Sequence, residues 1–217
     1  MGIRRITWRL YRDHNEVVNH KRTQRLMQLM GIQAIYPAPN TSRADKQNSI
    51  YPYLLKNIMA VRPNHIWGVD ITYIKVSGSW LYLYAVLDWY SRFVVGWELS
   101  DTMEAAFCIE SLKKALLVGT PEIHNSDQGS QFTSDEYLNV LRAKETIQIS
   151  MDSVGRALDN IFTERLWRTV KYEDVYVKDY QSPREARQSL ADYFTFYNYD
   201  REHMSLNNQT PAHIYFK

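Results

Sequence analysis

The alternation of apolar and polar positions predicts three consecutive strands in the middle of the chain. Between Trp67 and Ile74 apolar residues alternate with small or polar ones, which predicts a strand with one buried face. Residues 80–87 are almost continuously apolar, as expected for a strand buried on both faces, and residues 93–99 predict a third strand. Because the turns between them are short, we expect an antiparallel meander.

Helical and strand patterns alternate after this meander. Helices are predicted over residues 103–118, 134–141, 159–171 and 183–197, and strands over 122–126 and 147–150. We expect Asp101 or Thr102 to cap the first helix, Thr133 to open a capping box for the second, and Ser182 to open one for the last. The order predicts an α/β fold, with helices on the faces of a mixed five-stranded sheet.

A separate helical segment precedes this body. Helical spacing predicts helices over residues 2–13 and 20–30, with Asn19 as the N-cap of the second and Gly31 at its end. Residues 1–31 thus resemble part of a helix-turn-helix, and a small helical hairpin packed on the main domain is the alternative. The prolines and the polar run of residues 32–61 predict a linker, which leaves residues 62–217 as the main domain.

Composition and charge narrow the class of protein. An apolar content of 45% over 217 residues indicates a folded chain. The net charge of +2 conceals a split, because residues 1–60 hold ten Lys/Arg and three Asp/Glu while residues 61–217 carry a net −5. A basic head suggests a polyanionic partner, and a solvated charged surface is the alternative. The lack of a long apolar stretch or a secretory signal predicts a cytoplasmic protein with no membrane span.

One cysteine, Cys108, excludes an internal disulfide and a cysteine-based zinc site. The candidate chemistry lies instead in acids. Asp70 lies within the first predicted strand, on the face opposite its apolar residues, and Asp127 ends the fourth. If these two strands are neighbours, the carboxylates lie close and repel each other unless a proton or a metal ion lies between them. Mg²⁺ favours such carboxylates, although Asp127 alone could simply cap a turn.

A third acid lies on the helix predicted over residues 159–171. Glu164, Arg168 and Lys171 share one stripe of that helix, which fits either a surface ion pair or a metal ligand beside phosphate-binding cations. Asp152 and Asp159 are competing acids, of which Asp159 more plausibly caps the helix. Three carboxylates from two strands and a helix suit a two-metal site for phosphoryl transfer. No glycine-rich phosphate loop is present, which argues against a nucleoside triphosphatase.

Four blocks of sequence carry a family resemblance. They are residues 64–74 around Asp70, residues 124–134 around Asp127, residues 155–160 with Glu164 and Lys171, and a C-terminal set comprising Tyr197-Asn198, Arg201, His203, Ser205-Leu206 and Thr210-Pro211. In this order and spacing they resemble the integrase-type transposases of bacterial insertion sequences, of the kind encoded by a second reading frame with an Asp-Asp-Glu triad. The likeness covers essentially the whole chain.

The resemblance implies a ribonuclease H-like core of the retroviral integrase type. It implies that Asp70, Asp127 and Glu164 bind two Mg²⁺ ions, with Mn²⁺ as a substitute, and that Lys171 contacts the end of the element. The expected reaction is nicking at that end followed by attack of the freed 3′-hydroxyl on another phosphodiester. Further residues expected to contact DNA are Arg168, Arg156, Lys21, Arg22, Arg25, Arg201 and His203.

The same resemblance implies element ends and target DNA as partners, a homo-oligomer on DNA in the nucleoid, and the product of an upstream reading frame as an additional partner. Asp127 and Glu164 are separated by one residue more than is usual in the family. Two alternatives remain from the residues alone. One is a catalytically inactive or truncated DNA-binding regulator of the same element, and the other is a hydrolase of RNA–DNA hybrids.

Overall fold

The computed structural model describes residues 2–32, 50–152 and 160–217. The chain divides into two compact units, Met1–Ala44 and Asp45–Lys217, which are described separately. Within the described ranges, no helix has both the length and the apolar character needed to cross a bilayer.

The first unit is a pair of helices, α1 (Ile3–His14) and α2 (His20–Leu29). The side chain of Asn19 accepts a hydrogen bond from the backbone of Lys21, so this residue caps α2 as its sequence predicts. Gly31, with a φ of +65°, follows the helix and provides the left-handed residue that ends it. Thr23 and Met27 are the buried residues of α2.

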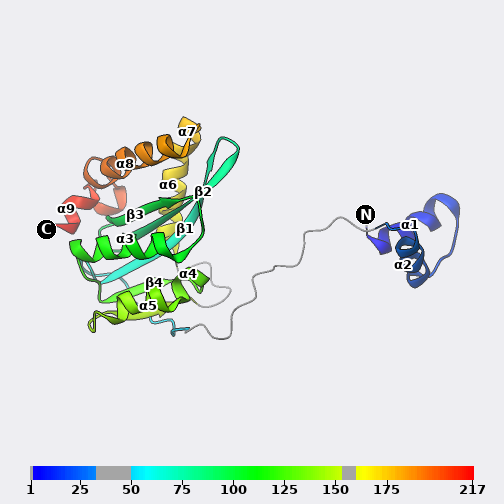
Figure 1. Ribbon diagram of the computed structural model, residues 1–217, viewed down its shortest axis with the longest axis horizontal. Helices are drawn as coiled ribbons and strands as arrows, with labels where there is room; N and C mark the ends of the chain where they lie inside the picture. Colours follow the sequence, from blue (N-terminus) through cyan, green and yellow to red (C-terminus); the bar gives the residue numbers. More distant parts are fainter. Residues whose placement is uncertain (1, 33–49, 153–159) are drawn as a thin grey trace. The chain divides into compact units, whose positions relative to one another are not determined.

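The second unit is built on a five-stranded mixed sheet (Figure 1). Its strands are β1 (Ile66–Val76), β2 (Ser79–Asp88), β3 (Val94–Ser100), β4 (Ile123–Ser126) and β5 (Gln148–Met151). Their order is β3-β2-β1-β4-β5, in which the first three form an antiparallel meander and β1, β4 and β5 run parallel. The predicted mixed sheet and its meander are therefore confirmed.

Helices cover both faces of this sheet (Figure 1). They are α3 (Ala105–Val118), α4 (Ser130–Thr133), α5 (Asp135–Arg142), α6 (Ile161–Val170), the π-helix η1 (Lys171–Val175), α7 (Tyr176–Lys178), α8 (Pro183–Tyr199), the 3₁₀-helix η2 (Met204–Leu206) and α9 (Pro211–Tyr215). One core joins the sheet to α6 and α8, and a second joins its other face to α3, α5 and α9. Because the side chains of a strand alternate, Val69 enters the second core whereas Asp70 faces α6.

Two predicted helix caps are wrong. The helix α3 starts at Ala105 instead of following Asp101 or Thr102, because the backbone N–H of Thr102 bonds the Ser100 hydroxyl and holds these residues in a turn. Ser134, not Thr133, caps α5 by accepting a hydrogen bond from the Tyr137 N–H. Thr133 instead belongs to the short helix α4, which the hydrophobic pattern did not predict.

The helix predicted to end at Lys171 instead continues from α6 into η1 and α7 without a break. The π turn contains Asp174, which is 1% exposed and is held by three polar partners: Tyr180, Ser189 and Lys178. An ionised carboxylate needs such partners when it leaves water. The irregular turn therefore depends on contacts with later residues, which helical periodicity does not report.

The stretch of residues 50–61 contains no helix or strand but packs on the second unit. Leu55 is 4% exposed, and the Leu54 N–H donates to the Ser150 hydroxyl on β5 over 3.0 Å. This part of the sequence-predicted linker therefore contributes to the core.

The edge strand β3 is closed by a side chain from α8. An edge strand leaves backbone N–H and C=O groups without a neighbouring strand. Asn198 satisfies both groups of Val94, since its Oδ1 accepts from the Val94 N–H at 2.9 Å and its Nδ2 donates to the Val94 carbonyl at 3.0 Å. The side-chain amide therefore acts as a short substitute for a sixth strand.

We expect Asn198→Ala to lower the free energy of unfolding by about 2–4 kcal/mol, because it leaves two buried backbone groups of Val94 without partners. Urea denaturation measures the change. Thr195→Ala, at an exposed position of the same helix, is the control and should change stability by less than about 0.5 kcal/mol. Equal effects of the two substitutions would contradict this role for Asn198.

Candidate active site

Parallel pairing of β1 with β4 brings the first two acids to one place on the sheet. Gly68 is the partner of Asn125, so Asp70 and Asp127 each lie two residues beyond the same pair. The two strands are therefore neighbours, which is the condition for their acids to lie close together. Because parallel strands run in the same direction, both carboxylates project near the carboxyl end of β4.

Two hydrogen bonds hold the carboxylate of Asp70. Its Oδ1 accepts from the Ile71 N–H at 2.8 Å, and its Oδ2 accepts from the indole Nε1 of Trp167 at 2.9 Å. Trp167 is 6% exposed and lies on α6 one turn after Glu164. This contact was not predicted from the sequence, but the tryptophan belongs to the core and a buried indole N–H generally needs a partner, and that requirement was the available signal.

Ionisation of the Asp70 carboxyl group is unfavourable at its largely buried position. Burial raises the pKa of its carboxyl group to about 6, the hydrogen bonds from Trp167 and Ile71 oppose the shift, and the charges of Asp127 and Glu164 add to it. The three acids therefore share one electrostatic environment. Such an environment favours a proton or a cation among the carboxylates.

Asp127 has one oxygen committed to the local turn. Its Oδ1 accepts the N–H of Gly129 at 2.9 Å, and this backbone contact opposes a rise in the pKa of Asp127 caused by desolvation. Within the described residues, its other oxygen accepts no hydrogen bond. The turn-capping role therefore exists, and it leaves one carboxylate oxygen available for a ligand.

Close packing of α6 on β1 positions Glu164. A Cβ on Gly68 would lie 2.1 Å from Nε1 of Trp89 and 3.2 Å from Oγ1 of Thr163, so only glycine allows this approach. Asn160 donates from Nδ2 to the Val69 carbonyl over 3.4 Å. Glu164 follows Thr163 with an exposed side chain.

Cationic side chains accompany the acids on α6 and η1. Burial lowers the pKa of Lys171, and the charge of Asp70 opposes that shift, which places the ammonium group within electrostatic reach of Asp70. Arg168 is exposed, with its guanidinium 5.8 Å from the centroid of the Tyr172 ring. Arg168 lies on α6 and Lys171 begins η1, so the stripe that the sequence predicts runs from one helix into the next.

The acids do not form a closed metal-binding shell. In the ranges that the structure describes, no three His, Cys, Asp or Glu side chains are close enough together to hold a metal ion. The donor set nevertheless fits a hard divalent cation, because its oxygens are carboxylates and the charges of its members raise the pKa of Asp70. Joint ligation would bring these oxygens closer than they lie here.

The other residues predicted to contact DNA occupy varied environments. Lys21, Arg22 and Arg25 are exposed on α2 of the first unit. Arg201 donates two hydrogen bonds from Nε and one from Nη2 to the carboxylate of Glu173. His203 is half-buried, and burial lowers its pKa to about 4. Arg156, together with the competing acid Asp159, lies outside the described residues.

The remaining competing acid has a partner within the sheet. Asp152 follows β5 and accepts a hydrogen bond from Nδ2 of Asn125 at 2.8 Å. The contact ties the end of β5 to β4, one strand away from Asp70.

The chain matches three protein families, one within the first unit and two within the second. Residues 60–157 and 145–211 match integrase core domain families, and residues 1–39 match an HTH-like domain family. A transposase for insertion sequence element IS904 of Lactococcus lactis subsp. lactis (strain IL1403) is 34% identical over 90% of this chain and 79% of the relative.

Solved structures of viral integrases share the fold. The HTLV-2 integrase catalytic core domain in complex with magnesium aligns over 72% of this chain and 99% of its own, with a TM-score of 0.59 and 20% identity. A simian T-cell lymphotropic virus intasome in complex with PP2A regulatory subunit B56 gamma aligns over 92% of this chain and 68% of that chain, with a TM-score of 0.64 and 16% identity. These likenesses confirm the ribonuclease H-like integrase fold.

His124 is fully buried on β4. Its Nε2 lies 3.0 Å from the Tyr137 hydroxyl, which in turn lies 2.9 Å from the Tyr84 hydroxyl, and its Nδ1 has no partner among the described residues. Burial lowers the pKa of His124 to about 4. The imidazole is therefore a neutral core group that cannot reach DNA.

This burial predicts an acid-sensitive core. Because the pKa of His124 is lower in the folded chain than the usual value of 6.5, the unfolded state binds more protons between these values. The contribution of His124 to stability is complete above pH 6.5 and falls by on the order of 3 kcal/mol as the pH drops towards 4. We expect His124→Gln to remove this part of the pH dependence.

Urea denaturation at pH 7.5 and at pH 5 measures the difference between the wild type and His124→Gln. His213→Gln, at an exposed position of α9, is the matched control and should keep the pH dependence of the wild type. If the free energy of unfolding had the same pH dependence in the wild type and in His124→Gln, His124 would not take up a proton on unfolding.

Proposed function

The chain belongs to the bacterial insertion-sequence transposases, and we propose that it nicks DNA at the ends of its element and joins the freed strand to a target. DNA transposition is the function of this family. The finer assignment, an Asp-Asp-Glu site made of Asp70, Asp127 and Glu164, is our proposal. The observation that carries it is the shared register of Asp70 on β1 and Asp127 just after β4, together with the influence of Glu164 on the pKa of Asp70.

The three carboxylates would hold two Mg²⁺ ions, and Mn²⁺ would substitute for them. When bound, the ions lower the pKa of an attacking water or hydroxyl and neutralise charge on the phosphate. The hydrogen bonds from Ile71 and Trp167 keep the Asp70 carboxylate in one orientation. The free oxygen of Asp127 and the exposed carboxylate of Glu164 complete the proposed set of ligands.

The reaction has two phosphoryl transfers at one site. In the first, water attacks a phosphodiester at the element end, and the P–O3′ bond breaks to leave a 3′-hydroxyl. In the second, this hydroxyl attacks a phosphodiester of the target, so one phosphodiester bond forms as another breaks. Neither step needs a nucleophile from the protein, which agrees with a site made of acids alone.

Cations from both units bind the DNA in this proposal. Arg168 on α6 and Lys171 at the start of η1 share the helical stripe of Glu164 and would bind phosphates next to the reacting one. Arg156 would add a contact from the segment before α6. In the first unit the exposed Lys21, Arg22 and Arg25 of α2 would bind the element end, with residues 1–31 as a DNA-binding segment and residues 62–217 as the catalytic core.

Arg201 and His203 were also predicted to contact DNA. The pairing of Arg201 with Glu173 and the half-buried state of His203 favour a role in supporting the fold near α6. We further propose that the active form is a homo-oligomer on DNA, because two element ends must be joined to one target. The solved viral relative described as an intasome supports such an assembly.

Isosteric removal of each acid tests the proposal. We expect Asp70→Asn, Asp127→Asn and Glu164→Gln to reduce nicking and joining by about 10³-fold or more, because each removes a negative charge required by the cations. The assay uses labelled oligonucleotides from the DNA that flanks the reading frame, with Mg²⁺ or Mn²⁺. Chelation of the metal should abolish both products in the wild type.

Asp135→Asn is the matched control, since it neutralises an exposed acid of α5 that pairs with Arg142. It should retain wild-type products. DNA binding without products in the wild type would favour the inactive regulator, and cleavage of RNA–DNA hybrids without any joined DNA would favour the hydrolase. Retention of joining by any of the three triad variants would refute the assignment of that residue.

A further inference from the structure

Two adjoining cavities lie on a second side of α6. Their volumes are about 330 and 540 Å³, and they share Arg92, Phe162 and Ser205. The α6 residues that line them are Phe162, Arg165, Leu166 and Thr169. At 100° per residue, this face is separated from the stripe of Glu164, Arg168 and Lys171, so the cavities are distinct from the proposed catalytic acids.

Arg92 lines both cavities, and its backbone conformation and side-chain environment are unusual. Its backbone is left-handed, with a φ of +64°, and its guanidinium lies 3.7 Å from the centroid of the Phe162 ring. Within the described residues, its side chain makes no ion pair or hydrogen bond. Burial lowers the pKa of Arg92, which indicates a charge removed in part from water, and the nearby charge of Asp88 opposes this shift without forming an ion pair with the guanidinium.

A second cation without an ion pair among the described residues lies nearby. Arg165 is exposed, belongs to no ion pair of the described residues, and its charge contributes to the lowered pKa of Arg92. Arg201 also lines the larger cavity, but its charge is matched by Glu173. The lining residues also include one exposed acid, Glu202, which is outnumbered by Arg92, Arg165 and Arg201, so the lining carries a net positive charge.

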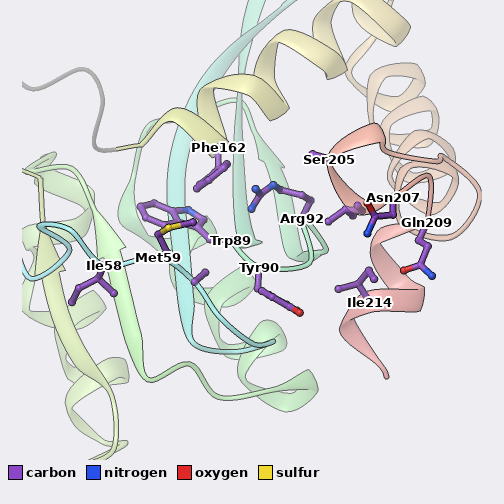
Figure 2. Close-up of a pocket in the computed structure, with 12 residues that line it drawn as sticks. Ile58, Met59, Trp89, Tyr90, Arg92, Phe162, Ser205, Asn207, Gln209 and Ile214 are labelled. Carbon is purple, nitrogen blue, oxygen red and sulfur yellow. The ribbon is translucent and has the colours of Figure 1, made fainter.

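The smaller cavity combines this charge with apolar walls. Figure 2 shows Arg92 extending from the turn between β2 and β3 towards Phe162, with Trp89 and Met59 on one side and the C-terminal segment on the other. Ile58 and Ile214 add apolar surface, and Ser205, Asn207 and Gln209 line the same cavity with polar groups. Aromatic and aliphatic walls beside arginines are features of sites for single-stranded nucleic acid.

An unpaired nucleotide suits these features better than a duplex. A duplex keeps its bases stacked inside and offers phosphates to a protein surface, whereas a cavity with apolar walls needs an apolar occupant. An unpaired nucleotide offers both a phosphate and an apolar surface. Its phosphate fits the planar guanidinium groups, and its sugar and base fit the walls.

We propose that these cavities bind an unpaired nucleotide of the DNA substrate, with its phosphate between Arg92 and Arg165 and its base against the walls formed by Phe162, Trp89 and Met59. The inference rests on the proposed function, because the strand belongs to the DNA that the catalytic site processes. A nucleotide held on this side of α6 would keep one strand separate from the strand at Glu164.

Binding of two oligonucleotides to the full chain tests this proposal. Fluorescence anisotropy, in buffer with EDTA, compares a labelled single strand of about 12 nucleotides with a blunt duplex of the same length. We expect Arg92→Gln to weaken single-strand binding by about tenfold and to reduce the salt slope by about 0.7, the value for one phosphate contact. Duplex affinity should change by no more than about twofold.

Two further variants distinguish a loss of binding at the cavities from a general loss of folding or of positive charge. Ser205→Asp places a negative charge at an exposed position of the cavity lining and should also weaken single-strand binding by about tenfold. Arg184→Gln removes the same charge as Arg92→Gln at an exposed site on α8 and should leave single-strand affinity within about twofold of the wild type.

Equal single-strand affinities for the cavity variants and Arg184→Gln would overturn the proposal, as would equal losses on single strand and duplex. Competition by an acidic peptide as strong as that by an oligonucleotide of equal charge would also overturn it. Because EDTA removes the metal chemistry, the result is separate from the nicking assay. A wild type that nicks DNA while Arg92→Gln binds normally would leave the proposed function intact and remove this inference alone.

Discussion

The parallel pairing of β1 with β4 is the constraint on which the site depends. It aligns Gly68 with Asn125 and therefore puts Asp70 and Asp127 at equivalent positions beyond that pair. The alignment has an electrostatic cost, visible in the pKa of Asp70, which is raised to about 6 by burial and by its acidic neighbours. The two cores on either side of the sheet supply the packing that offsets this repulsion.

The second requirement is that α6 lies close to β1. Gly68 leaves room for Trp89 and Thr163, and Trp167 then reaches Asp70 with its indole N–H. Together, α6 and the start of η1 consequently carry an acid and two cations on one side, and α6 carries part of the lining of the Arg92 cavities on another. Its placement couples the proposed chemistry to the proposed binding of a separated strand.

Patterns of apolar and polar residues predicted the elements that depend on residues close together in the sequence. Alternating or continuous apolar runs predicted the strands, and the placement of Asp70 and Asp127 followed from the pleat and the strand ends. The wrong caps at Thr102 and Thr133 arose because competing hydroxyl and backbone partners lay next to them. The contact between Trp167 and Asp70 spans 97 positions, so it depends on the packing of α6 on β1, which periodicity does not specify. The left-handed backbone of Arg92 is likewise set by its turn.

Cation binding tests the central claim, that Asp70, Asp127 and Glu164 form one site, most directly. The loss of the free Mn²⁺ signal in electron paramagnetic resonance, recorded with the full chain bound to DNA, counts bound ions without requiring catalysis. We predict two bound ions for the wild type and at least about tenfold weaker binding for Glu164→Gln, with Asp135→Asn unchanged. Wild-type Mn²⁺ binding by Glu164→Gln would contradict the account, because the helix would then contribute no ligand to the site.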